Sequence, residues 1–359
     1  MNTHNFRVGI VGAVSSYSLL LARAFRDMPN VEFAGLAHLD RSPRYIKDSL
    51  NLPWLTQYPK TLEGYADEFR AEIFVTLNDM ARAGQLDGVC ICTEDSLHQH
   101  YAVEAAEMGI HVFVPKPFAR SSEEARVMID AANKSNVTLL AGLPHRFNPG
   151  SVTAQKVIQK GDIGRPISGH FSIAHHLSLG GWKSDPSMAA GPEFEFGFYV
   201  FDQMRMMMGS EPQTVMGLGA NLDHQGIPYN DNGKCIVECV NGALASIDMI
   251  FSMHQHFPPA GRMHVIGDEG ALATETEPNT GKVEVVVYSP EGTERHGVPV
   301  WDTHEREMGE WIRLCRTGGH AWWQQEALGT LSLIEAYVDA CQSGSPVTAS
   351  SDNEFNREE

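Results

Sequence analysis

Residues 8–40 read VGIVGAVSSYSLLLARAFRDMPNVEFAGLAHLD, and this stretch decides the fold. Arg7–Gly12 is a short apolar run typical of a buried strand, and Ser15–Arg26 has the apolar spacing of a helix. Val31–Ala37 is a second apolar run, and the chain reaches the acidic Asp40 where this strand ends. Strand, tight turn, helix and strand in this order form the opening unit of a doubly wound parallel sheet.

The alternation of short strands and helices continues as far as Gly142. Further apolar runs, rich in Val and Ile, predict strands at Ala71–Leu77, Gly88–Thr93, His111–Val114 and Val137–Gly142. Helical patterns lie between the strands, at Tyr45–Leu50, Leu97–Met108 and Ser121–Asn133. The last of these opens with Ser-Ser-Glu-Glu, a capping box before an apolar stripe. Residues 1–143 are therefore expected to form a Rossmann domain, a parallel sheet covered by helices on both faces.

After Gly142 the pattern changes to strands separated by turn signals such as Asn241-Gly242. The predicted strands are Ile167–Ala174, Thr214–Ala220, Cys235–Cys239, Ala243–Met253, Arg262–Ile266 and Val283–Tyr288. The predicted helices are Phe196–Met208, His304–Thr317 and Gln324–Gln342. This order predicts a second α/β domain, residues 144–345, with a large, mostly antiparallel open sheet and helices on one face. The polar and acidic residues 346–359 are expected to form a tail.

The chain has 359 residues with 27 basic and 45 acidic side chains, a net charge of −18 at pH 7. So acidic a protein repels a phosphate backbone, which argues against nucleic acid as a general partner. No run of about 18 apolar residues is present, so no membrane span is expected. The N-terminus does not read as a secretory signal, and the cysteines are scattered rather than arranged as a disulfide framework. A cytoplasmic location with reduced thiols is therefore expected.

A dinucleotide-binding turn usually has glycine at three points, for the tight turn, for close approach of the pyrophosphate and for packing of helix on strand. The corresponding positions here are Gly12, Val14 and Tyr17, so only the first is glycine. Ser15 and Ser16 partly compensate, because their hydroxyls can cap the helix and donate to phosphate at its positive end. This segment alone leaves two interpretations open, a nucleotide site and a doubly wound domain without nucleotide.

The carboxylate of Asp40 stands where it can accept hydrogen bonds from both ribose hydroxyls of a dinucleotide. Arg41 and Arg44 keep a 2′-phosphate possible, but the negative charge of Asp40 opposes one. The expected cofactor is therefore NAD rather than NADP. The residues of this segment expected to contact it are Gly12, Val14, Ser15, Ser16, Asp40 and Arg41.

Further motifs follow in a fixed order along the rest of the chain. They are Asp87–Thr93 followed by His98, then His111–Pro117, Arg146–Pro149, Gly161–Pro166 and Gly191–Asp202. In this order and spacing the chain resembles the glucose–fructose oxidoreductase, inositol dehydrogenase and MocA (Gfo/Idh/MocA) family over nearly its whole length. The resemblance implies an N-terminal Rossmann domain, a C-terminal α/β domain on a large open sheet, and NAD(P)-dependent oxidoreductase activity. On these motifs the residues expected to contact the cofactor are Thr93, His98, Lys116 and Arg146, with helix capping as the alternative for His98.

Oxidation of a secondary alcohol sends a hydride from carbon to the nicotinamide and a proton from oxygen to a base. Lys116 lies between Pro115 and Pro117, which restrict its backbone and aim the ammonium at the reacting hydroxyl, where it can stabilise the oxyanion. In the family pattern an Asp and a His lie four residues apart on one helix. In this sequence the two corresponding positions are occupied by Glu195 and Tyr199. We expect Tyr199 to accept the proton, with its pKa lowered by Lys116, and Glu195 to orient one of the two.

Substrate recognition is expected from Trp182 and His176 together with Lys116 and Tyr199. Trp182 lies in a Gly-Gly-Trp-Lys loop before the helix of Tyr199 and can wall a sugar or nicotinamide site, with core packing as the alternative. Neighbouring histidines on a strand point to opposite faces, so His175 and His176 cannot chelate as a unit. No metal site is expected.

The predicted function is an NAD(P)-dependent oxidoreductase acting on a secondary hydroxyl of a sugar, polyol or related cyclic alcohol. Two alternatives within the family stay open. One is an NAD-dependent enzyme that cleaves glycosides through transient oxidation at C3, and the other is a non-catalytic regulator that binds dinucleotide as a signal. The retained Lys116 and Tyr199 argue against the regulator. A homo-oligomer, a dimer or tetramer, is expected by analogy, because the family's open sheet face commonly packs against another subunit.

Overall fold

The computed structural model describes residues 5–13, 15–39, 61–175, 181–253, 260–276, 282–319 and 321–349. The chain divides into two compact units. Unit 1 comprises residues 1–142, 179–190 and 304–325, and unit 2 comprises residues 143–178, 191–303 and 326–359. The predicted domains, 1–143 and 144–345, are contiguous, whereas each compact unit gathers separate stretches of the chain.

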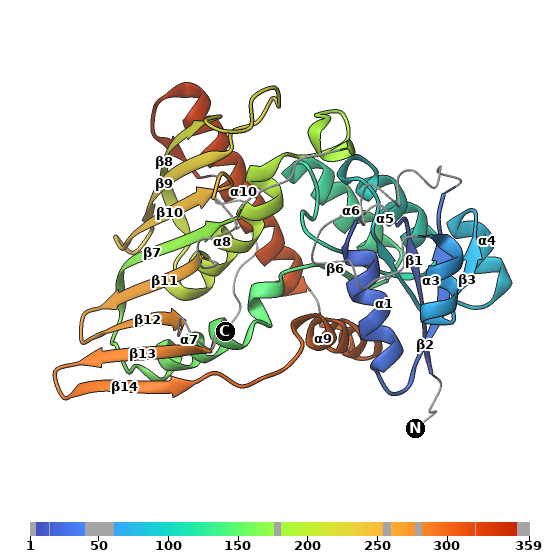
Figure 1. The fold of residues 1–359 in the computed structure, drawn as a ribbon, viewed down its shortest axis with the longest axis horizontal. Coiled ribbons are helices and arrows are strands. Elements are labelled where there is room, and N and C mark those ends of the chain that lie inside the picture. The colour runs from blue at the N-terminus through green and yellow to red at the C-terminus, as the bar shows by residue number, and fades with distance from the viewer. Residues whose placement is uncertain are drawn as a thin grey trace. The chain divides into compact units, whose positions relative to one another are not determined.

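Unit 1 is built on a parallel sheet whose six described strands have the order β3-β2-β1-β4-β5-β6 (Figure 1). Its elements up to residue 142 are β1 (Phe6–Val11), α1 (Tyr17–Asp27), β2 (Val31–Ala37), α3 (Leu62–Phe69), β3 (Glu72–Phe74), α4 (Leu77–Ala83), β4 (Gly88–Ile91), η2 (Asp95–Leu97), α5 (His98–Glu107), β5 (His111–Val114), α6 (Ser122–Lys134) and β6 (Leu139–Ala141). Later residues add η4 (Gly181–Ser184) and nearly all of α9 (Thr303–Thr317). The strand order reverses between β1 and β4, which is the doubly wound Rossmann arrangement. The fold predicted for this part is confirmed.

The start of α6 shows how local chemistry sets an element boundary. Ser121 Oγ accepts a hydrogen bond from the backbone N–H of Glu124 at 3.2 Å, as the capping box predicts. The carboxylate of Glu124 accepts from the backbone N–H of Arg120 at 3.0 Å, one residue earlier than a capping box requires. One half of the capping box is therefore formed, and α6 begins at Ser122, within one residue of the predicted start.

Trp311 of α9 fills the core of unit 1 and is fully buried. Its ring centroid lies 5.7 Å from that of Phe6, 5.8 Å from that of Phe113 and 6.5 Å from that of Phe25. Gly88 makes room for it, because a Cβ at residue 88 would lie 2.7 Å from Cη2 of Trp311. Residues from the end of the chain therefore complete the core of the N-terminal fold.

Unit 2 is built on a sheet whose nine described strands have the order β14-β13-β12-β11-β7-β10-β9-β8-β15. Its elements are η3 (Pro144–Arg146), α7 (Pro149–Lys160), β7 (Pro166–Ala174), α8 (Pro192–Met208), β8 (Pro212–Ala220), β9 (Asn232–Cys239), β10 (Leu244–Ile250), β11 (Ala260–Gly267), β12 (Ala271–Thr276), β13 (Val283–Ser289), β14 (Gly292–Gly297), most of α10 (Ala321–Ser343) and β15 (Val347–Thr348). The pair β7–β10 is parallel and the other described pairs are antiparallel. Helices α7, α8 and α10 lie on one face of this sheet (Figure 1), so the predicted mostly antiparallel sheet is confirmed.

Some elements of unit 2 differ from the sequence-based expectation. Strands β12 and β14 and helix α7 were not predicted. The expected tail, 346–359, contributes β15 to the edge of the sheet, where Val347 pairs with Val215 and Thr348 with Thr214. The weak helix predicted at Tyr45–Leu50 lies outside the described residues.

The second face of the unit 2 sheet carries exposed apolar side chains. Strand β9 alternates strictly between buried and exposed residues, which places one set of side chains under the helices and the other on the opposite face. The large apolar side chains on that opposite face, with their exposed fractions, are Met216 (50%), Leu218 (73%), Ile236 (48%), Leu244 (52%) and Ile266 (49%). We call this side of the sheet, opposite to the helices, the open face.

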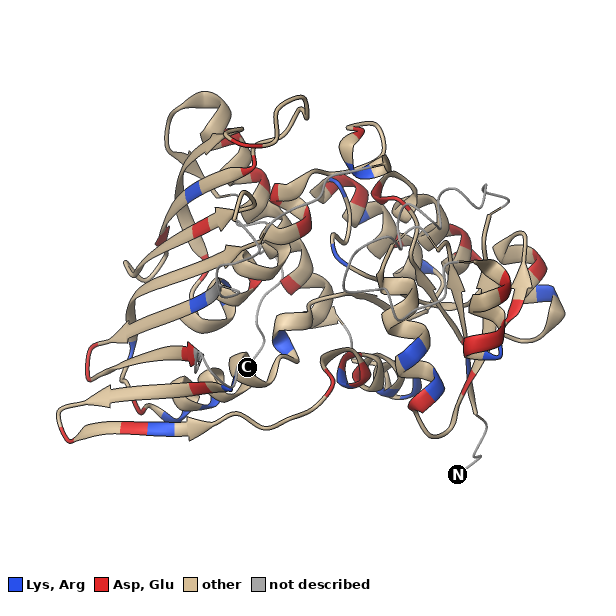
Figure 2. Ribbon diagram, in the orientation of Figure 1, with Lys and Arg blue, Asp and Glu red and all other residues tan. Residues whose placement is uncertain are grey.

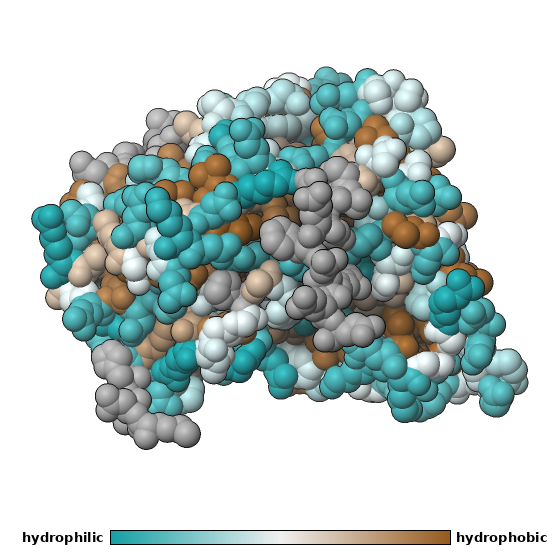
Figure 3. Space-filling model, turned by 180° about the vertical axis from the view of Figure 1, so that it is seen from behind, coloured by the Kyte–Doolittle hydropathy of each residue, from teal (hydrophilic) through white to brown (hydrophobic). Residues whose placement is uncertain are grey.

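The surface chemistry of the described residues is mixed. Acidic and basic residues are dispersed over helices and strands of both units (Figure 2). Hydrophobic and hydrophilic residues are interspersed on the side of the molecule seen in Figure 3. The described helices include none that is both long and apolar enough to span a membrane. The six cysteines are free, and burial raises the pKa of the Cys92 and Cys235 thiols.

Replacing Trp311 with Ala is expected to lower the free energy of unfolding by about 3–5 kcal/mol, because a fully buried ring is lost and a cavity remains. Trp322 on α10 is the matched control, since it is 46% exposed and its replacement with Ala should change stability by about 0.5 kcal/mol at most. Urea titrations followed by circular dichroism measure both variants. Equal losses would contradict the place of α9 in the core of unit 1.

Candidate functional site

The carboxyl ends of β1, β4 and β5 lie at one edge of the unit 1 sheet, because these strands are parallel neighbours. Gly12 comes one residue after β1, and Thr93 and Lys116 come two residues after β4 and β5. Ligands of doubly wound folds bind at this edge, where the strand order reverses. The structure therefore brings these three predicted site residues to the same edge.

Gly12 occupies a backbone conformation and a space that exclude a side chain. Its φ is +83°, and a Cβ at this position would lie 2.8 Å from Cγ2 of Thr93 and 2.9 Å from the carbonyl oxygen of Cys92. Its N–H donates to the carbonyl of Ala37 at 2.8 Å, which joins the turn to the end of β2. Gly12, the first glycine of the fingerprint, thus allows the tight turn that was predicted there.

The amino end of α1 suits an anionic group. Ser16 is the N-cap residue, but its side chain makes no capping hydrogen bond, contrary to the expected role, whereas Ser15 Oγ accepts from the N–H of Tyr17 at 3.3 Å. The first turn of α1 contains no acidic residue, so its positive end is not neutralised by its own helix. These residues fit the pyrophosphate of a dinucleotide. The other predicted contacts in this region, Val14, Asp40 and Arg41, lie outside the described residues.

His98 begins α5 and is buried, 3% exposed. Burial lowers the pKa of His98 to about 4, so the ring is neutral at pH 7. Its Nδ1 lies 3.0 Å from the carbonyl oxygen of Pro117, and because a carbonyl only accepts, Nδ1 carries the proton. The side chain therefore ties α5 to the residue that follows Lys116 instead of capping its own helix.

Lys116 is half-buried and flanked by Pro115 and Pro117. Its Nζ lies 5.9 Å from the ring centroid of Tyr17, within the range of a cation–π contact. Tyr17 is buried and stands at the third glycine position of the fingerprint. The sequence-based interpretation missed this contact, although an aromatic residue at a glycine position was a visible signal.

Glu195 and Tyr199 both lie on α8, which is helical throughout residues 192–208. Four residues apart, they face the same side of the helix one turn from each other, as predicted. The ring centroid of Tyr199 lies 5.2 Å from that of His145, a residue not predicted for the site. Burial lowers the pKa of His145 to about 4 although Asp202 opposes the change, and its buried Nδ1 has no hydrogen-bond partner among the described residues.

Arg146 is committed to an ion-pair network within unit 2. Its Nη2 donates to Asp202 Oδ1 at 2.7 Å and to Glu326 Oε2 at 2.8 Å, and its Nε donates to Asp202 Oδ1 at 3.0 Å. Burial opposes the charge, but the two carboxylates raise the pKa of Arg146. The guanidinium joins η3 to α8 and α10. Its predicted contact with the cofactor stays a prediction.

Trp182 on η4 is buried, 8% exposed, and packs with Ala189. The segment that carries it is held on unit 1, because Asp95 Oδ2 accepts from the N–H of Ala190 at 2.8 Å and the N–H of Ser96 donates to Met188 at 2.9 Å. The ring thus makes the packing contacts of the alternative interpretation. A substrate contact from Trp182 stays a prediction, and His176 lies outside the described residues.

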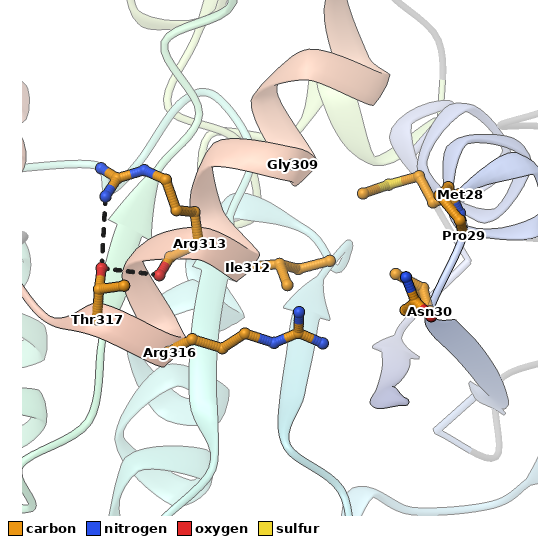
Figure 4. Close-up of a pocket in the computed structure, with 9 residues that line it drawn as sticks. Met28, Pro29, Asn30, Gly309, Ile312, Arg313, Arg316 and Thr317 are labelled. Carbon is orange, nitrogen blue, oxygen red and sulfur yellow. Dashed lines mark hydrogen bonds between the residues drawn. The ribbon is translucent and has the colours of Figure 1, made fainter. Parts of the chain in front are cut away.

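A cavity of about 270 Å³ lies between the α1–β2 turn and α9 (Figure 4). Figure 4 shows the side chain of Arg316 extended toward Asn30, while Arg313 turns toward Thr317. Val31, the first residue of β2, also lines the cavity, which places it at the amino ends of the strands. It therefore lies at the edge opposite to Gly12 and is not the candidate site.

Comparisons with known proteins agree with this geometry. Residues 6–143 match the model of an oxidoreductase family with an NAD-binding Rossmann fold, and residues 151–273 match the Gfo/Idh/MocA C-terminal domain. The chain belongs to the Gfo/Idh/MocA oxidoreductase family. The predicted family is thereby confirmed.

Two curated relatives show the kinds of protein to which the chain is similar. A levoglucosan dehydrogenase of Pseudarthrobacter phenanthrenivorans is 32% identical over 221 residues, 53% of this chain and 55% of that protein. A scyllo-inositol 2-dehydrogenase (NAD⁺) of Bacillus subtilis is 26% identical over 226 residues, 62% of this chain and 64% of that protein. The matched stretches thus span less than two thirds of the length of either relative.

Among solved structures, an oxidoreductase from Agrobacterium radiobacter in complex with NAD⁺, L-tartaric acid and magnesium has a TM-score of 0.80 to this chain. The alignment covers 96% of this chain and 98% of that one, at 18% identity. At this level of identity the likeness concerns the fold alone.

The buried His98 predicts a loss of stability in acid. Its pKa is about 4 in the folded protein against a reference value of 6.5, so between these pH values the unfolded chain binds a proton that the folded chain does not. The free energy of unfolding is therefore unaffected by the titration of His98 above pH 6.5 and falls by about 3 kcal/mol in total as the pH is lowered toward 4. The pKa of His145 is lowered in the same way, so His145 adds a loss of the same sign.

The measurement is urea unfolding of wild type and His98→Asn at pH 7 and pH 4.5, where the variant should show a shallower decline. His100→Asn is the control, because His100 lies on the same helix with its side chain 65% exposed and should leave the decline unchanged. A His98→Asn protein whose stability falls as steeply as that of wild type would refute this assignment.

Proposed function

We propose that this protein is an NAD(P)-dependent dehydrogenase that oxidises a secondary hydroxyl of a sugar, polyol or related cyclic alcohol. The observation that carries the proposal is the place of Lys116, two residues beyond β5, at the same edge of the Rossmann sheet as Gly12 and Thr93. Membership in an oxidoreductase family with an NAD-binding Rossmann fold supports it. The similarity to a levoglucosan dehydrogenase and a scyllo-inositol 2-dehydrogenase supports the substrate class.

The reaction removes two electrons from a secondary alcohol and leaves a ketone, so one C–H bond and one O–H bond break. A bound nicotinamide takes the hydride, and the protein has to receive the proton and stabilise the charge that develops on oxygen. We assign stabilisation of that charge to Lys116, because an ammonium donates hydrogen bonds and carries the opposite charge. We assign receipt of the proton to Tyr199. We assign to Glu195, one turn earlier on α8, the orientation of either Tyr199 or Lys116.

We infer that NAD is preferred over NADP. The support comes from the sequence, where the carboxylate of Asp40 follows the second strand and its charge opposes a 2′-phosphate. The positive charge of Arg41 favours a 2′-phosphate and therefore acts against this preference. The preference is measured by titration of both dinucleotides against the apoprotein. Tighter binding of NADP than of NAD would overturn this inference.

A matrix of NAD and NADP against polyols, sugars and aryl glycosides tests the function. Reduction of the nicotinamide, read by absorbance, and release of the aglycone are followed in parallel. Reduction with a polyol or sugar supports the proposal. Release of aglycone without net reduction would instead show redox-neutral glycoside cleavage, and affinity for neither dinucleotide would overturn both.

Replacing Lys116 with Met is expected to lower kcat/KM by about 10²–10³-fold, because the donor to the developing oxyanion is lost. Replacing Tyr199 with Phe is expected to lower it by about 10²–10⁴-fold through loss of the proton acceptor. Lys134→Met is the control, since Lys134 lies exposed at the end of α6 and should keep wild-type activity. Full turnover by Lys116→Met would refute the assigned role.

We further propose a homo-oligomer in which the open face packs against a second copy of the chain. Its exposed apolar side chains come from neighbouring strands, and burying them removes apolar surface from water. The polar members of the same face include the ion pair between Lys234 and Asp248, whose atoms lie 2.6 Å apart. A small-molecule substrate and a second copy are thus the proposed partners.

Ile236→Lys is expected to shift the protein from a dimer or tetramer toward the monomer, because it places a charge in the middle of the open face. Size-exclusion chromatography with light scattering measures the mass. Val300→Lys is the control, since Val300 is fully exposed outside the sheet and should leave the mass unchanged. A wild-type protein that is monomeric at micromolar concentration would contradict the proposal.

We also propose a cytoplasmic location. Its support is that the six cysteines are free, which fits a compartment where thiols stay reduced. Fractionation of the source cells with antibody detection tests it, and recovery in an oxidising compartment would overturn it.

A further inference from the structure

Tyr17 stands where a dinucleotide-binding turn usually has its third glycine, yet its side chain is buried, 5% exposed. Glycine at this place lets the helix pack closely on the strand, so a tyrosine there needs its own space. The structure shows that the ring lies next to Lys116, whose Nζ is 5.9 Å from the ring centroid. The residue that departs from the fingerprint therefore contacts the lysine on which the proposed function depends.

The contact with Tyr17 restricts the side chain of Lys116, which the backbone conformation alone does not fix. Pro115 and Pro117 limit the φ and ψ angles around the lysine, but its four-carbon stem remains flexible. The face of an aromatic ring carries partial negative charge and attracts an ammonium within about 6 Å. Attraction at the tip disfavours rotamers in which the ammonium points away, so fewer conformations compete with the one that meets a substrate oxygen.

The ring of Tyr17 is itself held by α9. The His304 ring meets it edge to face, with centroids 5.3 Å apart and planes at 80°. His304 Nδ1 lies 3.7 Å from Oε2 of Glu307, whose side chain is fully buried. Trp311, farther along the same helix, is anchored in the core of unit 1. The position of the ring is thus coupled to the packing of α9.

We propose that Tyr17 is a positioning residue that holds the ammonium of Lys116 at the carboxyl end of β5 through the face of its ring. This inference rests on the proposed function, which gives Lys116 its task at the reacting oxygen. It assigns the role to the aromatic face and not to the hydroxyl. Phenylalanine at position 17 should therefore serve, whereas leucine, which is bulky and apolar but not aromatic, should not.

The contact can be measured without substrate or cofactor. Reductive methylation with carbon-13 formaldehyde and a borohydride converts lysine amines to dimethylammonium groups, which keep their charge. The Lys116 resonance is assigned by its absence in Lys116→Arg. The ring current of Tyr17 should shift its methyl protons upfield in wild type and in Tyr17→Phe, and this shift should be lost in Tyr17→Leu. A wild-type Lys116 signal at the position of exposed Lys134 would overturn the proposal.

Turnover gives a second readout with an alcohol identified by the substrate matrix. Tyr17→Leu is expected to lower kcat about tenfold with KM for the dinucleotide unchanged, and Tyr17→Phe to keep kcat near wild type. In a Lys116→Met background, Tyr17→Leu should cause no further loss, because the group it positions is gone. Phe25→Leu, a buried aromatic replacement on the same helix, is the control and should lower stability without lowering kcat.

The outcomes separate this inference from the function on which it rests. Affinity for neither dinucleotide would overturn the proposed function, and full turnover by Lys116→Met would refute the role assigned to Lys116 at the reacting oxygen. In both cases an upfield shift of the Lys116 methyl groups in wild type would still show the contact with Tyr17. A large loss in Tyr17→Phe would show that the hydroxyl acts, and an equal loss from Tyr17→Leu with and without Lys116 would show a merely structural role. Either result overturns positioning by the ring. If Tyr17→Leu fails to fold, the wild-type and Tyr17→Phe spectra decide.

Discussion

The core of unit 1 is closed by a tryptophan that the chain supplies near its end. Trp311 is fully buried among rings from β1, β5 and α1, and Gly88 leaves the space that it fills. A side chain of this size is costly to leave in water, so the chain returns to unit 1 after β14 and adds β15 to the sheet of unit 2 only later. The return brings His304, at the start of the same helix, against Tyr17. Core packing and the surroundings of Lys116 thus depend on one helix.

The helices of unit 2 are held in a comparable way, by ion pairs between their side chains. Arg146 donates to Asp202 on α8 and to Glu326 on α10, and Arg205 on α8 contacts Glu326 as well. A charge removed from water has to find its partners, so each of these side chains fixes the helix that carries it. Asp202 lies three residues after Tyr199 on the same helix. The direction in which Tyr199 projects is therefore set by ion pairs within unit 2, alongside the ring contact with His145.

The fold was predictable wherever burial leaves a periodic pattern. Strands Val31–Ala37 and His111–Val114 agree to the residue, because most of their residues are apolar and the later residues of each strand are buried. Strand Gly292–Gly297 does not, since an edge strand with one neighbour keeps polar residues and shows no such run. The candidate site divides in the same way. Lys116 at a strand end follows from local pattern, whereas the contact of His304 with Tyr17 joins residues far apart in sequence that only tertiary packing brings together.

The incomplete glycine fingerprint shows that its three positions are not equivalent. Gly12 is required by geometry, because its φ is positive and a Cβ would collide with Thr93 and with the backbone of Cys92. The third position only requires that helix and strand can approach, and a side chain satisfies this when it turns toward another partner. The ring of Tyr17 lies 5.9 Å from Nζ of Lys116 and 5.3 Å from the ring of His304 on α9, so it has packing partners outside α1 and β1. A count of glycines therefore underestimates how well such a turn matches the dinucleotide-binding geometry. A departure from the glycine pattern is informative when the new side chain contacts another residue of the candidate site.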